Sequence, residues 1–108
     1  DIAKYSGSTV NNSFQINGKE SPKQTVESVS KWLDSSLEGN KLNCIVNAAG
    51  GFMMDDISSD NFYDNLDTMY KWNSLSAFQC GTIASRYLLP NHTPNSLLIL
   101  TGAAAAFN

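Results

Sequence analysis

Two short runs of small residues have the composition that lets a flat ligand lie close to the main chain. They are Asn47–Gly51 and Thr101–Ala103, and an apolar run precedes each of them. Small side chains permit close approach to the backbone, and glycine permits positive φ angles. Ligands of open α/β sheets bind beyond the carboxyl ends of the strands, where both runs would fall. The alternative is that both are only tight strand-to-helix turns, and the pattern leaves the two interpretations open.

Asn73 is the polar residue whose position is most unusual. It falls on the apolar face of a predicted helix, four positions after Met69 and seven before Cys80. A buried amide needs partners, because an unsatisfied one costs about 1–3 kcal/mol. One interpretation is that Asn73 holds a main-chain carbonyl group or a structural water near the active site, although the pattern alone somewhat favours the alternatives. The alternatives are that it caps a kink or faces another polar group.

The remaining reactive residue types indicate neither a metal site nor a nucleophile. His92 lies in a proline-flanked loop, where a solvated side chain is expected. The acidic stretch 55–60 has no histidine or further carboxylate cluster beside it, so it is interpreted as a solvated helix entry. Cys44 and Cys80 fall in apolar segments and are interpreted as small buried hydrophobes in a reducing compartment, as in a cytoplasmic protein.

The elements that would position these residues alternate between strand and helix. A first strand is predicted over 13–16. A helix follows, with Ser21 as N-cap, Pro22 at its first position, Gln24 completing a capping box and Gly39 ending it. Apolar residues at helical spacing give this helix one buried face: Val26, Val29, Leu33 and Leu37.

The second half continues the alternation. A strand over 42–49, a long helix over 61–89 with Ser59 or Asp60 as its cap, and a strand over 97–100 are predicted. The two later strands lack alternating polarity, which is typical of strands buried on both faces. This order predicts an α/β fold with a doubly wound parallel sheet of the Rossmann type, residues 1–108 forming the middle portion of a single domain.

Length and composition exclude several classes of protein. The chain has 108 residues, 42% hydrophobic and 16% charged, as in an ordinary globular domain. The net charge of -3 argues against nucleic acid as a partner. No apolar run is long enough for a membrane span, and no targeting signal is visible. The chain begins at Asp1 without an initiator methionine, which suggests a fragment.

Several motifs resemble those of the short-chain dehydrogenase/reductase family. Asn47–Gly50 is similar to the Asn-Ala-Ala-Gly turn that lies along the cofactor in that family. Asn73, on a helix that ends near Pro90, resembles the active-site Asn of the family. Ser96–Leu100 resembles the next strand, which in most members ends in a catalytic Ser. The resemblance covers most of the chain.

The dihydropteridine-reducing branch of that family is the closer match. Ala49–Phe52 resembles its Ala-Gly-Gly-Trp turn, Met69–Trp72 its Met-Trp-Lys segment, and Leu97–Ala106 the end of its strand. The resemblance implies NAD(P)H-dependent reduction of a quinonoid dihydropteridine, a pterin, to its tetrahydro form, as in tetrahydrobiopterin regeneration. NADH is the implied cofactor, with NADPH less favoured.

The resemblance also implies a role for individual residues. Asn73 is assigned to catalysis, and Phe52 and Ala103 to the pterin substrate. The residues implied in cofactor binding are Asp1, Asn47, Ala48, Ala49, Gly50, Thr101 and Gly102. In this family the long helix commonly packs against its copy, which implies a homodimer through helix 61–89 with Tyr70, Ser74 and Phe78 at the interface.

Departures from the family pattern define the rival interpretations. Ala103 falls where most members have the catalytic Ser; the dihydropteridine-reducing branch also has Ala, whereas a reductase of carbonyl compounds would normally need Ser. The glycine-rich phosphate-binding turn and the Tyr-x-x-x-Lys pair are absent, and would precede Asp1 and follow Asn108. The chain alone is therefore expected to be inactive. A non-catalytic nucleotide-binding scaffold is the third possibility.

Overall fold

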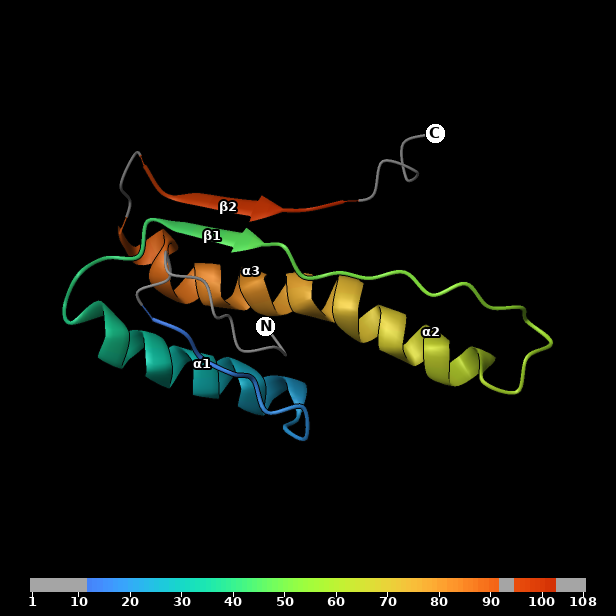
Figure 1. Cartoon of the computed structure of the whole chain (residues 1–108). Helices are drawn as coiled ribbons and strands as arrows, with labels where there is room; N and C mark the ends of the chain where they lie inside the picture. Colours follow the sequence, from blue (N-terminus) through green and yellow to red (C-terminus); the bar gives the residue numbers. More distant parts are fainter. Residues whose placement is uncertain (1–11, 92–94, 103–108) are drawn as a thin grey trace.

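The computed structural model describes residues 12–91 and 95–102 (Figure 1). Its elements in chain order are α1 (Pro22–Leu37), β1 (Cys44–Asn47), α2 (Phe62–Tyr70), the π-helix η1 (Lys71–Leu75), α3 (Ser76–Tyr87), the 3-10 helix η2 (Leu89–Asn91) and β2 (Leu97–Leu100). Asp1, His92 and Ala103 lie outside the described residues, so what was expected of them stays a prediction.

Helix α1 begins and ends where its local chemistry predicts. The Ser21 side chain accepts a hydrogen bond from the Gln24 N–H at 3.3 Å, and the Gln24 side chain accepts one from the Ser21 N–H at 2.9 Å. This reciprocal pair is the predicted capping box, and it satisfies donors that the first helical turn leaves free. The helix ends at Glu38 and Gly39, whose φ angles of 50° and 83° are left-handed.

The predicted long helix is confirmed, with one feature that the sequence pattern did not indicate. Helices α2 and α3 are joined through η1, where the hydrogen-bond pattern is that of a π-helix over five residues. The N-cap is Asn61, without a side-chain cap bond, instead of the expected Ser59 or Asp60. Because π segments are rare and often occur at functional sites, η1 directs attention to the residues around Asn73.

The two described strands are parallel neighbours, as the alternation of elements predicts. Cys44 pairs with Leu97 and Asn47 with Leu100, and the crossover between them is the α2–η1–α3 helix. The expected first strand over 13–16 is wrong: no strand is formed there, and Phe14 instead stacks on Trp32 of α1 with 5.7 Å between ring centroids. The described fold is thus mixed helix and strand, with a two-stranded parallel sheet.

The core lies between the helices and one face of the sheet. Figure 1 shows α3 between β1 and α1. Val26 and Leu33 of α1 and Ile83 of α3 form the buried cluster. Partly buried apolar residues surround it: Val29, Trp32, Leu37, Leu42, Ile45 and Tyr87. The face of α1 predicted from helical spacing is therefore the face that is buried.

Polar side chains of α1 and α3 make direct contacts with one another. Arg86 donates to Glu27 at 2.8 Å and to Ser30 at 3.2 Å, and the Tyr87 hydroxyl donates to the Asp34 carboxylate at 2.6 Å. The hydrogen bond from Arg86 lowers the pKa of Glu27, and burial is the main cause that raises the pKa of Tyr87. These contacts hold the two helices in one relative position.

The other face of the sheet is open, which contradicts the expectation of strands buried on both faces. On this face Val46 is 56% exposed, Leu97 52% and Ile99 40%. Cys44 is likewise exposed, not buried as expected, whereas Cys80 is partly buried and burial raises the pKa of its thiol. The physical reason is that α1 and α3 both lie on the same side of the sheet (Figure 1). No helix in the described part of the chain is long and apolar enough to cross a bilayer.

Candidate functional site

The two runs of small residues emerge side by side from the same edge of the sheet. The Asn47 carbonyl oxygen accepts a hydrogen bond from the Thr101 hydroxyl at 2.7 Å and another from the Thr101 N–H at 3.3 Å. Parallel pairing places the carboxyl ends of both strands at one edge, and these bonds extend the pairing just beyond β2. The predicted juxtaposition of Asn47–Gly51 with Thr101–Gly102 is confirmed.

Asn47 is the buried residue of the turn, and its side chain makes hydrogen bonds that hold the turn in place. The residue is 4% exposed, and its side-chain oxygen accepts from the Ala49 N–H at 3.2 Å. Its amide nitrogen lies 3.5 Å from the Ser76 hydroxyl oxygen, at the outer limit of a hydrogen bond. Ser76 in turn donates to the Trp72 carbonyl oxygen at 2.7 Å. The first residue of the motif therefore joins the turn to η1 and α3, and the residues after it form the exposed surface.

Asn73 holds the far end of the same turn. Its side-chain oxygen accepts from the Gly51 N–H, and its amide nitrogen donates to the Gly51 carbonyl oxygen, both at 2.9 Å. Of the interpretations left open by the sequence pattern, the one in which Asn73 holds a main-chain carbonyl group is confirmed. The expectation that it is buried is wrong: the residue is exposed, because η1 and the turn that it holds lie at the periphery of the described chain.

The two glycines of the turn are explained by η1. A Cβ at Gly51 would lie 2.5 Å from Cε3 of the Trp72 ring, and a Cβ at Gly50 would lie 3.0 Å from Oδ1 of Asn73. Neither glycine has a positive φ angle, so the left-handed conformation that glycine permits is not used at these two positions. Sequence reasoning missed the contact with Trp72, although its position beside Asn73 and the Gly-Gly pair were visible signals.

Other small residues at this edge are not required by packing. Ala48 and Ala49 are exposed, as are Thr101 and Gly102, and a Cβ at Gly102 would meet nothing within 4 Å. Phe52, which follows the turn, is 81% exposed. This edge of the sheet is therefore lined by exposed small side chains, with one exposed aromatic ring beside them.

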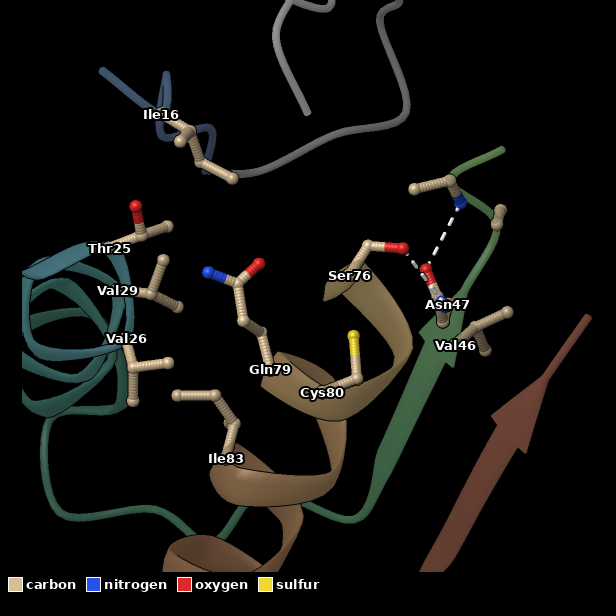
Figure 2. A pocket seen from close by; sticks show the side chains of 12 residues that line it. Ile16, Thr25, Val26, Val29, Val46, Asn47, Ser76, Gln79, Cys80 and Ile83 are labelled. Atoms are coloured by element: carbon tan, nitrogen blue, oxygen red, sulfur yellow. Dashed lines mark hydrogen bonds between the residues drawn. The ribbon is translucent and has the colours of Figure 1, made fainter. Parts of the chain in front are cut away.

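A pocket of about 350 Å³ lies beneath the turn, between α1, α3 and the end of β1 (Figure 2). Its polar side chains include Asn47, Ser76 and Gln79, and the Gln79 amide donates to the Pro22 carbonyl oxygen at 3.1 Å. The other lining residues are Ile16, Thr25, Val26, Val29, Val46, Ala48, Ala49, Cys80 and Ile83. Its predominantly apolar wall suits the flat part of a ligand better than a charged group.

The carboxylates of the acidic stretch after the turn accept hydrogen bonds from nearby residues of the chain. Asp55 accepts from Asn65 and Asp56 accepts from the Ser58 hydroxyl, and these hydrogen bonds lower the pKa of both carboxyl groups. Both aspartates are exposed, in agreement with a solvated entry to α2. Within residues 12–91 and 95–102, no group of three or more potential metal ligands is brought together.

Comparison with known proteins gives one informative similarity. The chain is 34% identical over 96 residues to a dihydropteridine reductase from Dictyostelium discoideum. The aligned part makes up 89% of this chain but 38% of that relative. No protein-family model matches the chain. The chain is therefore similar to a part of an oxidoreductase.

Proposed function

We propose that this chain is the middle part of a Rossmann-type, NADH-dependent oxidoreductase that reduces a quinonoid dihydropteridine to its tetrahydro form. The observation that carries the proposal is the pair of hydrogen bonds from Thr101 to the Asn47 carbonyl oxygen, which brings the two small-residue runs to one edge. Ligands of α/β sheets bind at such an edge. The partial similarity to a dihydropteridine reductase supports the same assignment.

The residues at this edge fit a dinucleotide. Ala48 and Ala49 are exposed and small, Gly102 has open space around it, and Thr101 keeps its hydroxyl lone pairs available as acceptors. In the proposed complex these residues and Gly50 lie along the cofactor, and Asn47 supports them from below. When bound, NADH supplies the hydride. Asp1 is proposed to accept hydrogen bonds from the adenine ribose, which favours NADH over NADPH.

The pterin is proposed to lie beside Phe52. A conjugated ring gains from an aromatic face, and this side chain is 81% exposed next to the proposed cofactor edge. Ala103 is proposed to line the same side, in the place where carbonyl reductases of the family have Ser. The proposed role of Asn73 is to hold the Gly51 main chain, so that the turn keeps its shape under the ligand.

Additional protein surface is proposed to cover the apolar surfaces that the chain exposes. Parallel sheets are ordinarily covered on both faces, yet Val46 and Leu97 are more than half exposed here. Tyr70 and Phe78, at 51% and 69% exposure, lie with the exposed Ser74 along the long helix. We propose that further segments of the same domain cover the sheet and that a second copy of the protein covers the helix.

The direct test is an assay of the complete protein with defined substrates. NADH consumption is followed with quinonoid dihydropteridine and, separately, with a simple aldehyde or ketone. The proposal predicts turnover of the pterin and little of the carbonyl compound, and Ala103→Ser should increase carbonyl reduction. Turnover of the carbonyl alone would favour a general short-chain reductase, and NADH binding without any turnover would favour a scaffold.

A further inference from the structure

The contact between Trp72 and Gly51 has no counterpart in the function proposed so far. A Cβ at Gly51 would lie 2.5 Å from Cε3, 2.8 Å from Cζ3 and 3.5 Å from Cδ2 of the Trp72 indole. Non-bonded carbon atoms essentially never approach to less than about 3 Å, so the six-membered ring occupies the space that any side chain at position 51 would need. We infer that Trp72 is a positioning residue that sets where Phe52 stands; this inference rests on the proposed function.

The π-helix brings two consecutive side chains to the same turn. In η1, Trp72 packs against Gly51 while Asn73 makes two hydrogen bonds to it. Steric contact from one side chain and hydrogen bonds from the next restrain different motions of the same peptide. The π segment thus acts as a template for the turn.

The exposed part of the turn is held at both ends by this template. At the start, Asn47 reaches Ser76, whose hydroxyl donates to the Trp72 carbonyl oxygen. At the end, the Trp72 ring and the Asn73 amide hold Gly51. Phe52 is the next residue, and its ring is free to contact a ligand. A side chain added at position 51 would collide with the indole and push the main chain of residue 51 away from Trp72. The main chain of Phe52, the next residue, would then shift with it.

The test uses the complete protein and a cycle of substitutions at Gly51 and Trp72. Gly51→Ala should raise the KM for quinonoid dihydropteridine about tenfold, because misplacement by around 1 Å is enough to cost that much or more. In the Trp72→Ala background the added methyl meets the space left by the indole, so there Gly51→Ala should change KM less than about twofold. Such loss of the effect is the signature of coupled positions.

Gly50→Ala is the matched control. Its added carbon would meet Asn73 Oδ1 at 3.0 Å and not the indole, so its effect should be the same with or without Trp72. The inference is overturned if Gly51→Ala costs the same in both backgrounds, or if Trp72→Ala leaves KM unchanged. If Gly51→Ala prevents folding, restored folding in the double variant supports the contact and continued misfolding contradicts it.

A second readout separates positioning from simple destabilisation and from failure of the proposed function. Isothermal titration calorimetry of the complete protein with NADH measures cofactor binding directly, independently of turnover. The inference predicts that the Kd for NADH changes less than about threefold in Gly51→Ala while KM for the pterin rises. If the Kd for NADH and the KM for the pterin change equally in Gly51→Ala, the inference about Trp72 is overturned but the proposed function is not. If the unsubstituted protein does not bind NADH, both are refuted.

Discussion

Replacing Asn73 by Ala gives the clearest test of the turn that the structure describes. The substitution removes both 2.9 Å hydrogen bonds to the Gly51 main chain. A typical intramolecular hydrogen bond contributes about 0.5–1.5 kcal/mol net. Because Asn73 is exposed and water can replace it, the lower half of that range applies, and the two bonds together predict a loss of about 1–2 kcal/mol.

Urea unfolding of the complete protein, followed by circular dichroism, measures this loss. With a urea dependence of about 2 kcal/mol per M, the midpoint should fall by about 0.5–1 M. Lys71→Ala, an exposed residue of the same π-helix whose ion-pair partner Asp67 is also exposed, is the control and should change stability by no more than about 0.5 kcal/mol. Asn73→Asp still accepts from the Gly51 N–H but sets a carboxylate oxygen against the Gly51 carbonyl, so at neutral pH it should cost at least as much as Ala. If both Asn73 variants unfold like the control, the two bonds do not hold the turn.

Three further predictions follow from named contacts. Ser21→Ala removes half of the capping box of α1 and should lower the free energy of unfolding by about 0.5–2 kcal/mol; an unchanged urea midpoint would mean that the cap contributes nothing. Phe52→Ala should raise the KM for quinonoid dihydropteridine more than the Kd for NADH, and equal effects in steady-state and binding measurements would make Phe52 structural. Burial raises the pKa of Tyr87 above its unfolded value of about 10, so its contribution to stability is complete below about pH 10 and is lost as pH rises through the folded pKa. Tyr87→Phe should therefore remove part of the stability loss seen on going from about pH 9 to 11, and an identical loss in both proteins would contradict the assignment.

Features determined by local chemistry were predictable from the sequence. The capping box at Ser21 and Gln24 depends on residues three positions apart, and the end of α1 on the conformational freedom of Gly39. The pairing of β1 with β2 followed from the alternation of apolar strands with helices. For the same reason the two small-residue runs were expected at one edge, which the Asn47–Thr101 contact confirms.

Features that depend on distant partners were not predictable. The π-helix lies in a stretch that continues an ordinary helical pattern, and its residues contact a turn more than twenty positions earlier in the chain. Burial was misjudged for Cys44 and Val46 because an apolar pattern cannot show which face of a strand has a covering helix. The glycine at 51 was attributed to backbone freedom and ligand approach, whereas its physical reason is the ring of Trp72.

The central claim is that Ala48–Gly50 and Thr101–Gly102 together form the surface along which a dinucleotide lies. A crystal structure of the complete protein with NADH tests it most directly. The account predicts main-chain or side-chain contacts from both runs to the same NADH molecule, with the pyrophosphate held by segments outside this chain. NADH bound elsewhere, or touching neither Ala48–Gly50 nor Thr101–Gly102, would contradict it.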